Sequence, residues 1–391
     1  MTMIRRLFLL LPVMLSAGCG TLLDPTEWLA SADVVEPNEL VDLQNEIQPR
    51  TLWTADTGAG TDEQRLALEP RVDGDTVYVA DGEGEVRAIA ADTGRPRWKV
   101  DLDLPVSGGP GVGDGLVLVG TSDGEIIALG AQSGDERWRS RVSSEVLSVP
   151  AAAQGVVVVH TIDGKVFGLE AATGAERWRY EREVPVLTLR GTGSPVLSGG
   201  IAYVGMSGGK LVALRIDNGS LIWELDVTVP GGRSELERLA DIDGDPLVFG
   251  GGIFVATYQG DVAAIEQRSG RVAWRRKVST YSRMAVDLKG LFVSDAEGVV
   301  WGLDVRSGNA RWSQDALKNR RLSNVALVGD LVVVGDFEGY LHWLDRDDGR
   351  MLARTRVGSD PITTGMVVVD GVLYVQGDGG ELAAIQPPGE L

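Results

Sequence analysis

Residues 76–100, TVYVADGEGEVRAIAADTGRPRWKV, contain three short apolar runs separated by two turn sequences. The runs are rich in β-branched residues, and the turns hold the Asp-Gly and Gly-rich pairs that supply the positive φ angles of tight hairpins. The stretch therefore predicts three antiparallel strands. Its second turn ends at Gly94, and Trp98 follows four residues later.

This pattern repeats along most of the chain. Trp stands four residues after Gly six times, and successive Trp residues are 40, 40, 45, 51 and 38 positions apart. A period of this length is typical of propellers and solenoids. Further copies occupy Leu116–Trp138, Val156–Trp178, Ala202–Trp223, Ile253–Trp274, Leu291–Trp312 and Leu331–Ala353, with a partial copy at Val372–Ile385.

The two ends of the repeat complement each other. The last copy has only two strands, whereas Trp53 stands in an additional strand sequence, residues 50–56, before the first copy. Pairing of residues 50–56 with Glu381–Ile385 would close a ring and remove its exposed sheet edges. A solenoid would instead need polar caps, which neither end resembles. We predict an all-β fold: an eight-bladed β-propeller of four-stranded antiparallel blades, closed by the N-terminal strand, with the Trp side chains packed between blades.

Composition narrows the function. The 391 residues include 37 Lys and Arg against 56 Asp and Glu, a net charge of −19, which disfavours nucleic acid and anionic lipid as partners. A single Cys excludes a disulfide within the chain. The two His residues, His160 and His342, stand in or beside apolar strands and argue against a zinc site. We expect structural histidines, no catalytic residue, no metal and no cofactor.

The amino terminus has the pattern of an export signal. Arg5 and Arg6 precede an apolar core at Leu7–Leu15, and Ser16-Ala-Gly18 leads directly to Cys19, the only Cys. These small residues before Cys19 resemble a bacterial lipoprotein processing site, and Gly20 after it implies sorting to the outer membrane; an ordinary signal peptide with a chance Cys is the alternative. We predict a lipoprotein signal peptide at 1–18, lipidation at Cys19, a lipidated tether at 19–49 and the propeller at 50–391, with membrane contact through the lipid only.

Two stretches, residues 181–194 and 229–245, break the repeat, and extra residues in a propeller emerge in connecting loops where sites are placed. Apolar anchors ringed by charges are typical of partner recognition. Leu187 and Leu189 could equally point inward from the next strand. A calcium loop at Asp241–Asp245 is the weaker alternative, since it lacks the remaining ligand spacing. The candidate partner-binding residues are Leu187, Leu189, Arg190, Asp241 and Asp243.

The cassette resembles the repeat of quinoprotein alcohol dehydrogenases, for example at Gly124–Trp138 and Gly298–Trp312. Those enzymes are longer, hold a calcium–quinone site and often a vicinal disulfide, which a single Cys excludes. Over nearly the whole chain, the closer resemblance is to the BamB family, propeller lipoproteins of the outer-membrane β-barrel assembly machine. The stretches that carry it are Leu187–Gly191, Ser234–Asp243 and Val334–Trp343.

This resemblance implies a non-catalytic scaffold, lipid-anchored at the periplasmic face of the outer membrane, that binds the POTRA domains of the barrel-assembly subunit. In that family the first two stretches carry the POTRA contacts, and the five candidate residues stand at the matching positions. Nascent outer-membrane proteins are a second expected partner. A quinone-dependent dehydrogenase and a propeller sugar-binding module are the alternative functions.

Overall fold

The computed structural model describes residues 35–61, 66–182, 193–228, 241–363 and 365–388. The chain divides into two compact units, Met1–Glu36 and Pro37–Leu391. In the first unit only Val35 and Glu36 are described, and both are exposed. The predicted signal peptide and Cys19 lie outside the described residues. Within them, no helix has the length and apolar character needed to span a membrane.

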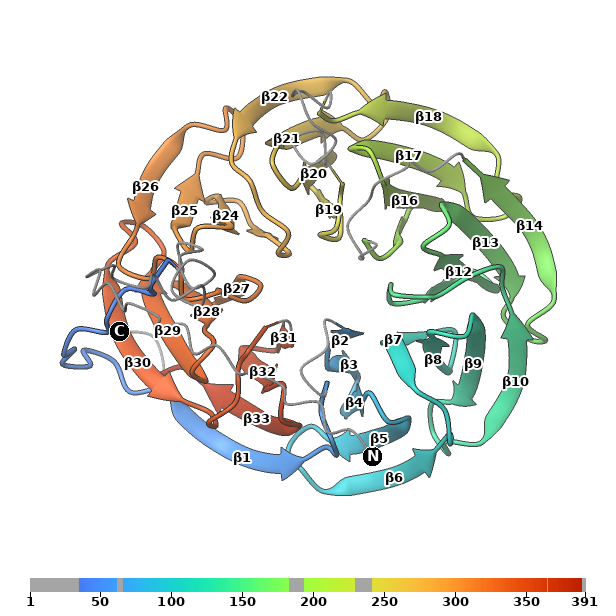
Figure 1. Ribbon diagram of the computed structural model, residues 1–391, viewed down its shortest axis with the longest axis horizontal. Coiled ribbons are helices and arrows are strands. Elements are labelled where there is room, and N and C mark those ends of the chain that lie inside the picture. The colour runs from blue at the N-terminus through green and yellow to red at the C-terminus, as the bar shows by residue number, and fades with distance from the viewer. Residues whose placement is uncertain (1–34, 62–65, 183–192, 229–240, 364, 389–391) are drawn as a thin grey trace, which may run out of the picture. The chain divides into compact units, whose positions relative to one another are not determined.

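The second unit is a ring of eight antiparallel blades, as predicted (Figure 1). From the centre outward, the first three blades are β3 (Arg71–Asp73), β4 (Thr76–Ala80), β5 (Glu85–Ala90) and β6 (Pro96–Asp101); β7 (Val106–Gly113), β8 (Leu116–Thr121), β9 (Glu125–Gly130) and β10 (Glu136–Arg141); and β11 (Ala151–Ala153), β12 (Val156–His160), β13 (Lys165–Glu170) and β14 (Glu176–Glu181). The next two are β15 (Val196–Ser198), β16 (Ile201–Met206), β17 (Lys210–Arg215) and β18 (Leu221–Asp226); and β19 (Leu247–Phe249), β20 (Gly252–Ala256), β21 (Asp261–Glu266) and β22 (Val272–Lys277).

The sixth and seventh blades are β23 (Ala285–Val286), β24 (Leu291–Ser294), β25 (Val300–Leu303) and β26 (Ala310–Gln314); and β27 (Ala326–Val328), β28 (Leu331–Gly335), β29 (Tyr340–Asp345) and β30 (Met351–Arg356). The eighth blade combines both ends of the chain: β31 (Met366–Val369), β32 (Val372–Gln376), β33 (Glu381–Gln386) and β1 (Arg50–Asp56). One further strand, β2 (Ala67–Leu68), pairs with β7 in parallel and adds a fifth strand to the second blade.

The N-terminal strand closes the ring. Strand β1 pairs antiparallel with β33, from Arg50 opposite Gln386 to Asp56 opposite Glu381. The closure predicted between residues 50–56 and Glu381–Ile385 is therefore confirmed. The indole of Trp53 in β1 donates to the carbonyl of Ala91 in the first blade at 2.9 Å, which ties the last blade to the first.

The repeated Trp residues join neighbouring blades, as predicted. Each indole N–H donates to a backbone carbonyl of the following blade, at 2.8–3.2 Å. Each ring also lies where a Cβ on the turn Gly of that blade would stand: a Cβ on Gly134 would come within 2.8 Å of Trp98. A side chain larger than hydrogen there would displace the indole of the preceding blade, which explains why Gly recurs at this turn of the first seven blades.

The seventh blade reverses this arrangement. In the other blades a small Ala or Gly on the third strand faces Trp on the fourth, but here Trp343 on β29 faces Ala353 on β30. Trp343 is fully buried, and its indole bonds Thr355 of its own blade at 2.9 Å. Buried Ile47, upstream of β1, packs in the same core cluster as Ala353. In this blade the indole thus comes from the third strand instead of the fourth. Ile47, from the N-terminal segment, adds its side chain to the same core cluster.

Residues 37–49, here called the strap, lie against the outside of the seventh blade (Figure 1). Its backbone bonds Lys318 at Asn38 and Leu352 at Glu46, at 3.0 and 2.8 Å. Asn45 exchanges two hydrogen bonds with the backbone of Arg354, at 3.0 and 2.9 Å. Contacts with the propeller thus reach upstream of residue 50 as far as Asn38, inside the segment 19–49 that we predicted to be a tether.

The connections define two faces of the ring. Neighbouring strands of a blade run in opposite directions. The connection from the outermost strand of one blade to the innermost strand of the next therefore lies on the same face as the turns between second and third strands. We call this the loop face. The turns between first and second strands, and between third and fourth strands, lie on the opposite face, the turn face.

Candidate partner-binding surface

The two stretches that break the repeat fall at consecutive blade junctions, and the strands that flank them end at the loop face. The first connects β14 to β15 and the second connects β18 to β19. Leu187, Leu189 and Arg190 lie outside the described residues, so their direction, toward the core or toward solvent, remains a prediction. Residues 181–182 and 193–194 of the first stretch and residues 241–245 of the second are described.

These described ends meet. The amide of Ser194 donates to the Asp245 carboxylate Oδ1 at 2.7 Å. A Cβ on Gly193 would come within 3.1 Å of the Ile242 carbonyl and 3.2 Å of the Gly244 carbonyl, so the two backbones run in close contact. The structure therefore brings the end of the first stretch beside residues 242–245, which include Asp243. A single patch that also includes Leu187, Leu189 and Arg190 stays a prediction.

Asp241 is buried, whereas a residue that contacts a partner is expected to be exposed. Its side chain is 3% exposed, and Oδ1 accepts from the amide of Gly208 in the β16–β17 turn at 2.7 Å. Its carbonyl accepts from Tyr258 at 3.1 Å, so Asp241 links the fourth and fifth blades. The neighbouring Ile242 is buried where a Cβ on Gly205 would clash with it. Asp241 thus holds the second stretch in place, while Asp243 is partly exposed.

His160, at the end of β12, contacts the described end of the first stretch. The ring is buried, and Nδ1 lies 3.2 Å from the Gly193 carbonyl. Because a carbonyl only accepts, Nδ1 must carry the proton. Burial disfavours the charged ring and lowers the pKa of His160 to about 4, although the Gly193 bond and Asp163 oppose that shift. The neutral imidazole is therefore the form that holds Gly193.

Acidification should destabilise the fold, because the buried His160 ring resists protonation. The pKa of His160 is depressed from 6.5 in the unfolded chain to about 4 in the fold, so its contribution is present above pH 6.5 and is lost as pH falls toward 4. At pH 5 the loss amounts to about 2 kcal/mol of unfolding free energy. Urea denaturation of wild type and His160→Gln between pH 8 and 4.5 measures it. We expect the wild-type curve to fall more steeply; parallel curves would contradict the assignment.

A cavity of about 590 Å³ opens at the centre of the ring. It is lined mainly by the innermost strands β7, β11, β15 and β19, and its charged residues are Arg71, Asp245 and Arg283. Among the described residues, no group of three or more His, Cys, Asp or Glu could hold a metal ion. A lining with one carboxylate and two guanidinium groups is not the set of acidic ligands that the calcium–quinone alternative needs.

Comparison with known proteins agrees with this geometry. A family model described as outer membrane protein assembly factor BamB matches residues 39–110, 82–314 and 297–388. The protein of that name from Pseudomonas aeruginosa is 52% identical over 348 residues, which cover 89% of this chain and 92% of the relative. The one from Escherichia coli is 33% identical over 394 residues, covering 98% and 99%.

Solved structures give the same result for the fold. The crystal structure of BamB from Moraxella catarrhalis superposes with a TM-score of 0.79 at 26% identity, covering 87% of this chain and all of that one. A quinohemoprotein alcohol dehydrogenase from Comamonas testosteroni superposes at 0.66 with 14% identity, covering 88% and 78%, a likeness of fold alone. On the strength of the family model and of these relatives, the chain belongs to the BamB family of outer membrane protein assembly factors.

Proposed function

We propose that this protein is a non-catalytic scaffold, anchored by lipid at the periplasmic face of the outer membrane, that binds the POTRA domains of the barrel-assembly subunit. In this role it aids the folding and insertion of β-barrel outer-membrane proteins. The observation that carries the proposal is the meeting of the two irregular stretches on the loop face, at Ser194 and Asp245, in a chain of the BamB family.

A rigid ring suits this task because recognition loops on a fixed frame lose little conformational entropy when they bind. The frame fixes the ends of both stretches through Asp241, His160 and Ser194. The net charge of −19 would steer a partner with a basic surface toward the ring and speed its association. Leu187, Leu189 and Arg190 would then supply the central anchors, with Asp243 at the edge.

Arg190→Ala and Leu187→Ala should each weaken binding to isolated POTRA domains at least tenfold, since truncation of a central anchor commonly costs about 2 kcal/mol. Surface plasmon resonance with the soluble propeller measures the dissociation constant. Arg268→Ala and Leu288→Ala are matched controls, because both side chains are exposed in turns of the opposite face. The controls should bind like wild type.

Circular dichroism and thermal melting separate recognition from folding. Normal melting with weakened binding supports the contact role of Leu187. A lowered melting temperature for Leu187→Ala would instead show that this side chain points into the core. Wild-type affinity for both Arg190→Ala and Leu187→Ala would place the recognition surface elsewhere on the ring.

Cys19→Ser should release the protein from the membrane. A thioether-linked diacyl group and an N-acyl chain would together bury enough methylene groups to make the anchor effectively permanent. Metabolic labelling with palmitate, followed by membrane fractionation, measures the loss. Affinity for POTRA domains in solution should be unchanged, because the lipid is not part of the recognition surface. Palmitate label that persists in the variant would contradict lipidation at Cys19.

A further inference from the structure

Charged residues connect across the centre of the ring where the loop face opens onto the cavity. Glu69, just after β2, accepts from Asn324 Nδ2 at 2.9 Å and forms an ion pair with Arg283. Arg283 also binds Asp245, with Nη2 2.8 Å and Nε 3.1 Å from Oδ2. We call Glu69, Asp245, Arg283 and Asn324 the mouth network. Its members come from four different connections of the propeller, so it joins loops that are far apart in the sequence.

Asp245 is the point where the mouth network reaches the two recognition stretches. One carboxylate oxygen, Oδ2, takes the Arg283 guanidinium, and the other, Oδ1, accepts from the Ser194 amide at 2.7 Å. Asp245 itself ends the second stretch, two residues after Asp243, and Ser194 ends the first, four residues after Arg190. A single carboxylate therefore holds the ends of both stretches.

The opposite end of the network is fixed to the strands. The Glu69 amide donates to Gly109 of β7 at 3.2 Å, beside the two parallel pairs between β2 and β7. Asn324 accepts from the Arg283 amide at 2.9 Å and holds that backbone too. Burial opposes the charge on Arg283, but Glu69 and Asp245 outweigh it and raise the pKa of Arg283, so the guanidinium stays charged.

We propose that Asp245 and Arg283 are positioning residues of the partner-binding surface, which set the two recognition stretches in their binding arrangement without touching the partner. This inference rests on the function proposed above. Its physical basis is that a charge-assisted bond to a partly buried guanidinium restricts the direction as well as the length of the contact. Substitutions that act through such a frame typically change binding by about three- to thirtyfold.

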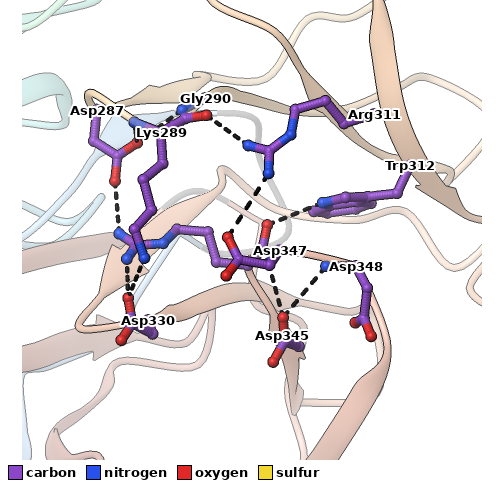
Figure 2. Close-up of polar contacts among 10 residues, drawn as sticks. Asp287, Lys289, Gly290, Arg311, Trp312, Asp330, Asp345, Asp347 and Asp348 are labelled. Carbon is purple, nitrogen blue, oxygen red and sulfur yellow. Dashed lines mark hydrogen bonds and ion pairs between the residues drawn. The ribbon is translucent and has the colours of Figure 1, made fainter.

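The turn face supplies a matched control (Figure 2). There Arg346 lies between two carboxylates, as Arg283 does: Nη1 is 2.6 Å from Asp287 Oδ2, and Nη2 pairs with Asp330. Lys289 binds Asp330 at 2.9 Å. The Arg346 side chain is 11% exposed and Asp287 28%, close to 19% for Arg283 and 14% for Asp245. Asp287→Ala therefore breaks the same arrangement, one Arg between two carboxylates, on the face that carries neither recognition stretch.

The first test compares Asp245→Ala with Asp287→Ala in full-length mature protein. We expect Asp245→Ala to weaken POTRA binding about tenfold, since Ser194 loses its acceptor. Asp287→Ala should bind POTRA domains within twofold of wild type. Its melting temperature should fall by about as much as that of Asp245→Ala. Wild-type affinity for Asp245→Ala, or equal losses in both variants, would overturn the inference, because each outcome describes a role in stability alone.

A double-mutant cycle supplies the second readout. If Asp245 acts by placing the anchors, its loss should matter little once Arg190 is gone, so the two effects should not add. Additive losses would overturn the inference. The two proposals fail differently: if Arg190→Ala and Leu187→Ala lose binding but Asp245→Ala does not, only the positioning role is wrong. If none of the three variants weakens binding, the proposed recognition surface and the positioning role are both wrong.

Discussion

A soluble form that begins at residue 57 should fail to fold or should lose more than about 5 kcal/mol of unfolding free energy, most of what a single domain has. The deletion removes β1 and leaves the edge of β33 unpaired from Glu381 to Gln386. It also removes the Trp53 bond to the first blade and the buried side chain of Ile47 beside Ala353. Without its closing strand, the ring has an exposed edge at β33 and loses the contact between its first and last blades.

Two further truncations assign the loss to particular contacts. A form that begins at residue 37 keeps every contact of the strap and should melt like the full mature chain. One that begins at residue 50 keeps β1 but loses Ile47 and Asn45, and should fall by about 2–5 kcal/mol, the usual cost of emptying one large apolar site. Calorimetry of the three forms measures the series. Equal melting temperatures for the forms that begin at residues 37 and 57 would contradict closure by β1.

The blades were predictable from the sequence because each is encoded locally. Two turns with Gly, β-branched runs between them and one Trp recur often enough to reveal a period, and Trp53 shows where the ring closes. The strap escaped prediction because its contacts do not follow the repeat: Asn45 bonds Arg354, more than 300 residues away in the sequence. In the seventh blade the Trp stands on the third strand and the Ala on the fourth. The sequence showed this only as Ala353 in place of the Trp expected four residues after Gly349.

The site was predictable in part. Breaks in the period located the two irregular stretches, and the structure places their described ends together at Ser194 and Asp245. The mouth network was not foreseen, because Glu69, Arg283 and Asn324 are single residues in connections of irregular length and no spacing relates them. The burial of Asp241 was likewise hidden, since an Asp in a loop sequence usually indicates an exposed side chain.

Asp336→Ala should destabilise the seventh blade by about 3–5 kcal/mol, because it leaves the buried Arg320 guanidinium with Glu338 as its ion-pair partner, and the Glu338 side chain is 45% exposed. Asp336 is fully buried, and its Oδ2 accepts from Arg320 Nε and His342 Nε2, both at 2.8 Å. Oδ1 accepts from the amides of Glu338 and Tyr340 in the β28–β29 turn. Arg320 in turn donates to the Asn38 carbonyl at 3.1 Å, so the cluster also secures the strap.

Asp295 is the matched control, because it holds the equivalent turn of the sixth blade without a buried charge. Its Oδ1 accepts from the amides of Glu297 and Val299, and its Oδ2 accepts from the neutral indole of Trp301 at 2.8 Å. Asp295→Ala should therefore cost only about 1–3 kcal/mol, the price of unsatisfied neutral donors. Urea denaturation at pH 7.5 compares the two variants, and equal losses would contradict the importance of the buried Arg320.

The pH dependence of Asp336→Ala tests its charge directly. Burial opposes ionisation, but His342 and Arg320 outweigh it and lower the pKa of Asp336 below 3.8. A lowered pKa stabilises the fold fully above the unfolded value, and this contribution disappears as pH falls through the folded one. The difference between wild type and Asp336→Ala should thus be constant near neutrality and shrink below pH 4. Asp336→Ala combined with Arg320→Met should recover stability, because the buried charge left behind is what makes the single substitution costly.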